Sequence, residues 1–188
     1  MKRLIFIFRV ILNFGITQTI IDYNFISGSD TLQAVNSPYI STTSVIIYTG
    51  ATVVVEDSVE WQFYSNTELR VLGTLKTLGD STRNIKFTLY DSTGQWSGIF
   101  LDESDSSIIK NSIIENASNG IKVDDDRNTD YPQVYNNEIR NCGYGIFVDG
   151  TRDGRFYIDN NFIHNNSSGI YTWKAEPIIV NNIIINNS

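Results

Sequence analysis

Apolar and polar positions repeat in one pattern along the C-terminal half of the chain. Four segments read apolar-x-Asn-[Asn/Ser]-x-Ile-x-Asn, at residues 109–116, 134–141, 158–165 and 179–186. Apolar and polar side chains alternate within each segment, which is the period of short β-strands with one face on a core. Asn tolerates the left-handed backbone conformation, so the Asn positions predict corners between successive strands.

A second phrase, Gly-Ile-x-x, precedes each copy of the first. Its glycines are Gly98, Gly120, Gly145 and Gly169, which lie 22 to 25 residues apart. A repeat of this length indicates stacked supersecondary units. Strands separated by a full circuit of the chain pair in parallel. The pattern therefore predicts a solenoid in which each strand lies beside the equivalent strand of the next coil.

Equivalent positions of the repeat predict ladders along this solenoid. Two apolar ladders are expected to be buried, Ile109–Val134–Ile158–Ile179 and Ile114–Ile139–Ile163–Ile184. Side-chain amides at one position of an in-register stack can hydrogen-bond to one another. Two amide ladders are therefore expected, Asn111–Asn136–Asn160–Asn181 and Asn116–Asn141–Asn165–Asn186.

Upstream of the repeat, alternating segments separated by glycine turns predict further strands. These strands are Val45–Tyr48, Thr52–Val55, Val59–Tyr64, Glu68–Leu72, Thr74–Leu78 and Ile85–Leu89. Nothing in the chain from residue 45 onward has helical spacing, so the predicted fold class is all-β.

The repeated phrases and the Trp96-Ser97-Gly98-Ile99 segment resemble the right-handed parallel β-helix family, the pectin-lyase-like superfold. The resemblance covers about residues 45–188. It implies a single-stranded right-handed parallel β-helix with short strands and Asn and Gly turns. That superfold hosts lyases, hydrolases, epimerases, adhesins and phage tailspikes, so function has to be argued from individual sites.

The ends of the chain predict its location and boundaries. Residues 1–19 have the basic start and apolar run of a secretory signal peptide, which predicts a secreted or cell-surface protein. The alternative is an N-terminal capping helix of the solenoid. The run is too short and too interrupted to span a bilayer. Residues 20–44 are interpreted as a polar lead-in and cap, and residues 45–188 as the β-helix.

The C-terminal strand of the pattern is unusually apolar. Residues 183–185 are consecutive isoleucines, whereas outward positions of earlier copies hold Glu138, Arg140 and His164. A bare terminal strand of this kind invites pairing with another chain. Further coils, a cap or end-to-end self-association are therefore expected at this end.

Charge and cysteine content exclude several functions. The chain has 14 Lys and Arg against 21 Asp and Glu, a formal net charge of −7. An acidic chain without basic clusters argues against nucleic acid and anionic membranes as partners. The single cysteine, Cys142, precludes an intrachain disulfide framework and is interpreted as a small turn residue.

No complete catalytic site is evident in the sequence. The one histidine, His164, occupies an outward position equivalent to Glu115 and Arg140, which is interpreted as a solvated strand position. A zinc site lacks His and Cys partners. The segment 124–130 is similar to Asp-Asp and Asn-Thr-Asp motifs of polygalacturonases, but both phrases share one loop. An inverting pair needs carboxyl groups about 6.5–9.5 Å apart, so we interpret this segment as a solvated turn.

One row of carboxylates is a candidate calcium site. Asp102, Asp124 and Asp149 each lie four residues after a repeat glycine, which should stack them along one edge; we call them the aspartate row. Like charges one strand apart repel unless a cation lies between them or the loops splay apart. Calcium is the only cofactor that the sequence suggests, and splayed loops are the alternative.

An outward row of aromatic residues is a candidate carbohydrate-binding site. Phe100, Phe147 and Tyr171 lie two residues after a repeat glycine, and Trp173 follows at the aspartate position; we call these four the aromatic row. Aromatic rings stack on the apolar faces of sugars, and adjacent carboxylates accept hydrogen bonds from hydroxyl groups. The alternative is that loops cover the rings.

Two functions from different classes follow. The first is a secreted or cell-surface β-helix module, structural or adhesin-like, that binds a polysaccharide or cell-surface glycan without catalysis. The second is a polysaccharide lyase, glycoside hydrolase or epimerase whose catalytic residues lie partly outside this chain. We favour the first, because no acid–base pair is complete in the sequence.

Overall fold

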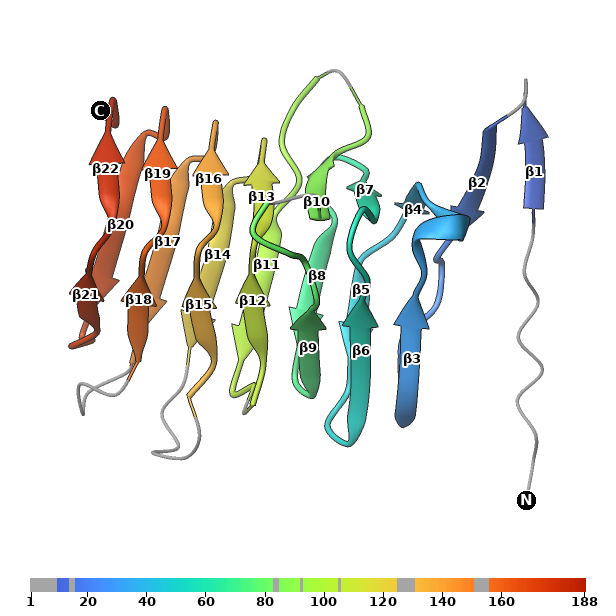
Figure 1. The fold of residues 1–188 in the computed structure, drawn as a ribbon, viewed down its shortest axis with the longest axis horizontal. Helices are drawn as coiled ribbons and strands as arrows, with labels where there is room; N and C mark the ends of the chain where they lie inside the picture. Colours follow the sequence, from blue (N-terminus) through green and yellow to red (C-terminus); the bar gives the residue numbers. More distant parts are fainter. Residues whose placement is uncertain are drawn as a thin grey trace.

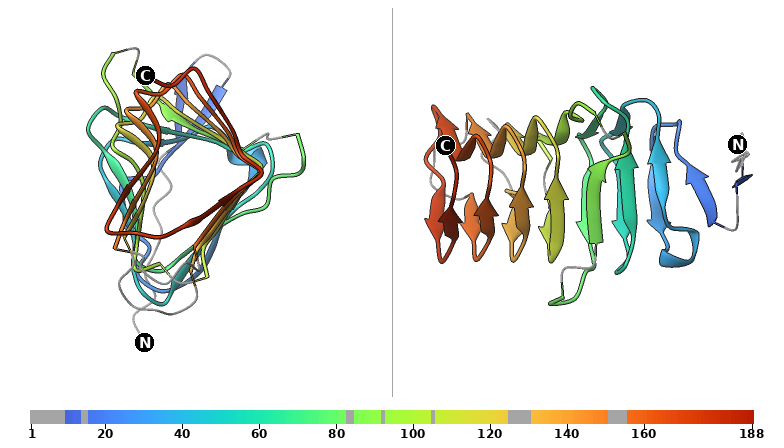
Figure 2. Two further views of the ribbon diagram at one scale, coloured as in Figure 1. Left: turned by 90° about the vertical axis from the view of Figure 1, so that its left-hand side faces the viewer. Right: turned by 90° about the horizontal axis from the view of Figure 1, so that it is seen from above.

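The chain folds as a parallel β-solenoid in the computed structural model. The structure describes residues 10–13, 16–82, 85–91, 93–104, 106–124, 131–150 and 156–188. Successive coils stack along the long axis of the molecule (Figure 1). Seen along that axis, the coils overlie one another as a rounded triangle whose sides are three sheets (Figure 2).

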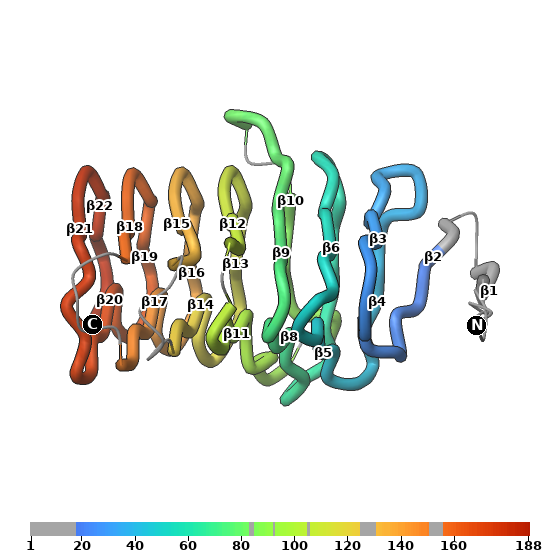
Figure 3. The backbone as a smooth tube through the Cα atoms, turned by 90° about the horizontal axis from the view of Figure 1, so that it is seen from below, coloured from blue at the N-terminus to red at the C-terminus, as the bar shows by residue number. Residues whose placement is uncertain are grey.

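From β4 (Tyr39–Ser41) to β21 (Ile178–Val180), each coil contributes one strand to each of three sheets, and the tube in Figure 3 shows the coils side by side. Sheet A is formed by β1 (Val10–Asn13), β2 (Ile16–Ile20), β4 (Tyr39–Ser41), β7 (Glu60–Phe63), β10 (Ile85–Leu89), β13 (Ser112–Glu115), β16 (Glu138–Arg140), β19 (Phe162–His164) and β22 (Ile183–Ile185). Sheet B is formed by β5 (Val45–Ile47), β8 (Glu68–Val71), β11 (Gly98–Asp102), β14 (Asn119–Asp124), β17 (Tyr144–Asp149) and β20 (Ser168–Trp173). Sheet C is formed by β3 (Gly28–Leu32), β6 (Ala51–Val55), β9 (Thr74–Thr77), β12 (Ile108–Lys110), β15 (Gln133–Tyr135), β18 (Tyr157–Asp159) and β21 (Ile178–Val180).

The parallel pairing extends N-terminal to the predicted start of the solenoid. β3 pairs in parallel with β6, and β2 pairs in parallel with β4. The antiparallel pair β1–β2 and the short 3-10 helix η1 (Ala34–Asn36) complete this end of the described chain. The predicted strands between residues 45 and 89 all occur, with bounds that differ by one residue at most.

The two predicted apolar ladders are confirmed. Ile109, Val134 and Ile158 pair in register and are buried, and so are Ile114, Ile139 and Ile163. Their last members, Ile179 and Ile184, keep the register but are 45% and 43% exposed, since no described coil follows them. The repeat glycines lie where neighbouring coils approach closely. A Cβ atom at Gly145 would be only 2.5 Å from the carbonyl oxygen of Gly169.

One rung of the predicted amide ladders forms, since Asn160 Nδ2 donates to Asn136 Oδ1 (2.5 Å). The buried ladders are displaced by one residue. All eight predicted Asn residues have positive φ, between 49° and 60°, and so form the corners of the coils. The residue after each corner points inward instead. Asn137 Nδ2 donates to Asn161 Oδ1 (3.1 Å), and Asn161 Nδ2 donates to Asn182 Oδ1 (3.0 Å). A second, shorter ladder joins Asn166 to Asn187 (3.0 Å), and the Cys142 backbone N–H donates to Asn166 Oδ1 (2.9 Å).

Cys142 therefore occupies the ladder position that Asn166 and Asn187 hold in the next two coils. Its thiol is buried, and burial raises its pKa to about 12. A thiol with so high a pKa is protonated at neutral pH and unreactive, which agrees with its interpretation as a structural residue.

Candidate functional site

The aromatic row lies on the outer face of sheet B. Strand pairing places Phe100 beside Lys122, Lys122 beside Phe147, and Phe147 beside Tyr171. Each of these residues follows a repeat isoleucine that points inward, so alternation directs its side chain outward. Arg70 of β8 precedes Phe100 in the same row. The predicted placement of Phe100, Phe147 and Tyr171 along one sheet is confirmed.

Cations cover one end of this row. The Lys122 ammonium lies 4.2 Å from the ring centroid of Phe100 and 5.7 Å from that of Phe147. The Arg70 guanidinium carbon lies 5.3 Å from the Phe100 centroid. These are cation–π distances, so the ring of Phe100 already has charged partners. The Phe100 end of the row is therefore the part least suited to stacking on a ligand.

The opposite end of the row presents a cluster of exposed rings. The ring centroids of Tyr144, Phe147 and Tyr171 are 5.2 to 5.7 Å apart. Tyr144 is 38% exposed, Tyr171 is 37% exposed and Trp173 is 52% exposed. Sequence reasoning missed Tyr144, because it began this strand at Gly145, whereas β17 begins at Tyr144. This cluster is the part of sheet B that can contact a flat ligand.

The aspartate row is in register beside the aromatic row. Asp102 pairs with Asp124, Asp124 pairs with Asp149, and Trp173 takes the next position, as the repeat predicts. The Arg70 guanidinium donates to Asp102 through Nε (2.7 Å) and through Nη2. The hydrogen bond to Asp102 raises the pKa of Arg70. Arg70 therefore supplies the positive charge that one end of the row requires.

Metal ligation by the aspartate row stays a prediction. Within the described ranges, no group of three or more His, Cys, Asp or Glu side chains is arranged to hold a metal ion. The loops that follow Asp102, Asp124 and Asp149 run partly through residues outside the description. Residues 125–130, which include the phrase similar to polygalacturonase motifs, also lie outside it.

Acid and base groups of sheet A form an ion network. The carboxylate of Glu115, which is buried, accepts hydrogen bonds from Arg140 (2.8 Å) and Thr88 (3.0 Å) and lies 2.9 Å from the Lys86 ammonium. Burial alone would raise the pKa of Glu115, but the hydrogen bonds from Lys86 and Arg140 outweigh it and lower the pKa. A carboxylate held ionised in this way is not poised to act as a general acid.

His164 belongs to the same network. It pairs with Arg140 and Ile185 along sheet A, as predicted. Its Nε2 lies 3.2 Å from Glu138 Oε1, and its ring stacks on Phe162 with centroids 4.2 Å apart. The side chain is therefore a partly buried member of an ion network, and the interpretation of a freely solvated position is too simple.

The three stacked parallel sheets define the class of protein as a parallel β-helix. Residues 97–188 match the family described as the right-handed beta helix region, and the parallel solenoid of the structure agrees with this match. No curated protein and no solved structure is significantly similar to the chain. In the part of the chain that the structure describes, helices of the length and apolarity needed to cross a membrane are absent.

Proposed function

We propose that this chain is a secreted or cell-surface β-helix module that binds a polysaccharide or cell-surface glycan and has a structural or adhesin-like role. The observation that supports this proposal most strongly is the ring cluster on sheet B, in which the exposed rings of Tyr144 and Tyr171 lie against the half-buried ring of Phe147. Trp173 is exposed at the end of the same strand as Tyr171. Amphipathic aromatic rings offer a stacking surface and, in Tyr and Trp, a hydrogen-bonding group. The sheet beneath holds them in fixed register, so little conformational entropy is lost on binding.

The charges around the rings favour a neutral glycan over an acidic one. The outer face of sheet B carries Glu68, Asp102, Asp124 and Asp149 against Arg70 and Lys122. Arg70 is paired with Asp102, which leaves an excess of carboxylates. Carboxylates accept hydrogen bonds from sugar hydroxyl groups but repel the carboxylates of a polyuronate.

The experiment is a depletion assay on insoluble polysaccharides. Purified chain is mixed with cellulose, xylan, mannan and chitin, and unbound protein is measured after sedimentation. The double variant Phe147→Ala/Tyr171→Ala should lose binding while its circular dichroism spectrum and Tm are retained. A matched control is Tyr64→Ala/Tyr90→Ala, which removes another stacked pair of rings (centroids 4.8 Å apart) directly after strands β7 and β10 of sheet A.

Unchanged retention of the Phe147→Ala/Tyr171→Ala variant would refute binding through this cluster. The alternative function, a polysaccharide lyase, glycoside hydrolase or epimerase, is tested on the same preparations. Release of reducing ends, or of unsaturated products that absorb in the ultraviolet, from neutral or uronate polysaccharides would establish catalysis and overturn the non-catalytic proposal.

A further inference from the structure

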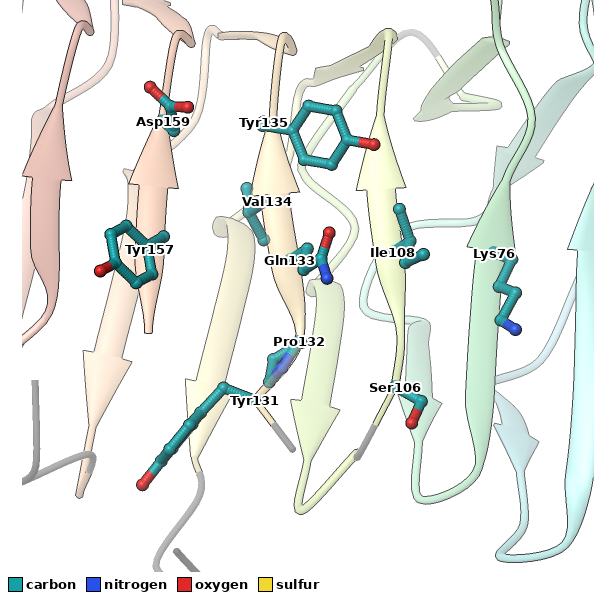
Figure 4. Close-up of a pocket in the computed structure, with 10 residues that line it drawn as sticks. All are labelled: Lys76, Ser106, Ile108, Tyr131, Pro132, Gln133, Val134, Tyr135, Tyr157 and Asp159. Atoms are coloured by element: carbon teal, nitrogen blue, oxygen red, sulfur yellow. The ribbon is translucent and has the colours of Figure 1, made fainter. Parts of the chain in front are cut away.

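The outer face of sheet C contains a hollow of about 630 Å³, away from the aromatic row. Strands β9, β12, β15 and β18 contribute to it, together with the segment immediately before β15 (Figure 4). We call it the sheet C hollow. Its volume lies within the range of about 300–1,000 Å³ that is usual for small-molecule sites.

Strand register builds the floor and sides of the hollow. β9 places Lys76 beside Ile108 of β12, and Ile108 lies beside Gln133 of β15. Two residues after Gln133 on β15, Tyr135 lies beside Asp159 of β18. The inward neighbours of these side chains, Ile109, Val134 and Ile158, are fully packed in the core. The outward side chains therefore stand on a rigid base, spaced about 4.8 Å apart across the strands.

The lining combines flat rings with hydrogen-bonding groups. Tyr157 is 52% exposed, and Tyr135 is half-buried with its ring extending from β15 toward β12 (Figure 4). Gln133, which is exposed, lies two residues before Tyr135 on β15 and offers both an amide donor and an amide acceptor. The Asp159 carboxylate is positioned by a hydrogen bond from Asn181 Nδ2 (3.0 Å).

The charge of the lining indicates an uncharged ligand. Among the described residues that line the hollow, Lys76 and Asp159 are charged, one of each sign, and they lie on opposite sides of Gln133 in Figure 4. Three strand spacings separate β9 from β18, a width of about 14 Å. The hollow is thus wide enough for an elongated ligand, and the charges of its described lining residues balance, which does not favour an ionic ligand.

We infer that the sheet C hollow is a second glycan subsite, which binds a neutral oligosaccharide by stacking on Tyr135 and Tyr157 and by hydrogen bonds to Gln133. A peptide that adds as a strand needs a sheet edge, whereas β12 and β15 are paired on both sides. The subsite shares the ligand class of the proposed function but none of the residues of the ring cluster on sheet B, so either site can fail without the other.

Fluorine NMR of chain labelled with 3-fluorotyrosine tests the subsite directly. Each of the 10 tyrosines gives its own signal, assigned with Tyr→Phe variants. The probes are cellohexaose, xylohexaose and mannohexaose, with hexagalacturonate as the charged comparison. A neutral hexaose should shift the signals of Tyr135 and Tyr157 in a saturable manner, and more strongly than hexagalacturonate does.

Variants supply the second measurement. Calorimetry should show that Tyr135→Ala/Tyr157→Ala weakens binding of that hexaose by about tenfold or more. Gln133→Ala, a milder change at an exposed position, should weaken it less, and Tyr64→Ala/Tyr90→Ala should leave it unchanged. Shifts confined to Tyr144 and Tyr171 would overturn the subsite while supporting the proposed function. Shifts at no tyrosine, or preference for hexagalacturonate at Tyr135 and Tyr157, would also overturn it.

Discussion

The side-chain amide of Asn137 donates a hydrogen bond to Oδ1 of Asn161 in the next coil, at 3.1 Å. The same oxygen accepts the backbone N–H of Asn137 at 3.0 Å. Both residues are buried, so water does not satisfy their polar groups. The pair provides hydrogen-bond partners for main-chain and side-chain groups that have no strand partner at the tight corner. The repeated Asn therefore has two physical roles, since the first Asn forms the corner and the second satisfies the interior.

Substitution of Asn161 should be costly for this reason. Asn161→Ala removes the acceptor of the Asn137 backbone N–H and the donor to the Val134 carbonyl (3.2 Å). Each buried group left without a partner costs about 1–3 kcal/mol. The free energy of unfolding, measured by urea titration, should fall by at least that amount.

Asn160→Gly is the matched control one residue away. Asn160 is exposed and has φ of 53°, a conformation that glycine adopts without strain. Its removal should change the free energy of unfolding by less than about 1 kcal/mol. Equal losses for Asn160→Gly and Asn161→Ala would show that the inner ladder has no special role.

The apolar ladder predicts that the cost of truncating an isoleucine depends on its position along the solenoid. Ile139 is fully buried between Ile114 and Ile163, so Ile139→Ala should cost about 2–5 kcal/mol through the cavity that it leaves. Ile184 belongs to the same ladder but is 43% exposed. Ile184→Ala should therefore cost well under half as much in the same urea titration, and a larger loss at Ile184 than at Ile139 would contradict the packing.

Much of the fold could be predicted because the alternation of apolar and polar residues marks the strands and the Asn positions mark the corners. The buried amide ladders were expected one residue too early because strict alternation fails at a corner. The buried positions are Ile109, then Ser112, then Ile114, a spacing of three and then two. The corner residue Asn111, with φ of 49°, uses up one position, so the inward phase moves to its successor. Strict alternation continued through the corner therefore assigns the wrong residue to the interior.

The candidate sites were only partly predictable for a related reason. The aromatic row occupies one position of the repeat, so an alignment of the copies finds it. The sheet C hollow combines Tyr135, which lies inside one copy of the repeat, with Tyr157, which precedes the next copy. Coil stacking brings both tyrosines to the lining of one hollow. A comparison of equivalent positions of the repeat does not detect this arrangement.

The calcium hypothesis for the aspartate row is tested by thermal unfolding. A site with Kd of about 1 mM, typical of weak extracellular calcium sites, stabilises the native state by about 1.4 kcal/mol at 10 mM calcium. For a chain of this size, Tm should rise by about 3–6 °C. Asp124→Asn/Asp149→Asn should abolish the response, and magnesium serves as the control ion. An unchanged Tm would mean that the aspartates are accommodated without a cation, as Arg70 already accommodates Asp102.

The ion network of sheet A makes stability depend on pH in a predictable direction. The pKa of Glu115 in the folded chain is lower than its ordinary value of 4.5. Between these two values the unfolded chain binds more protons than the folded chain, so the free energy of unfolding rises with pH. The stabilisation is therefore fully present above about pH 4.5 and is lost as pH falls through the folded-state pKa.

Glu115→Gln isolates this contribution from that of other carboxylates. The variant should be less stable at pH 7, because Lys86 and Arg140 lose the carboxylate that they share. Its deficit relative to the original chain should shrink as pH falls below 4.5, since protonation then neutralises Glu115 in the original chain as well. Urea titrations at intervals between pH 7 and pH 3 measure this difference. A deficit that stays constant over that range would show that the ion pairs of the Glu115 carboxylate do not contribute to the free energy of unfolding.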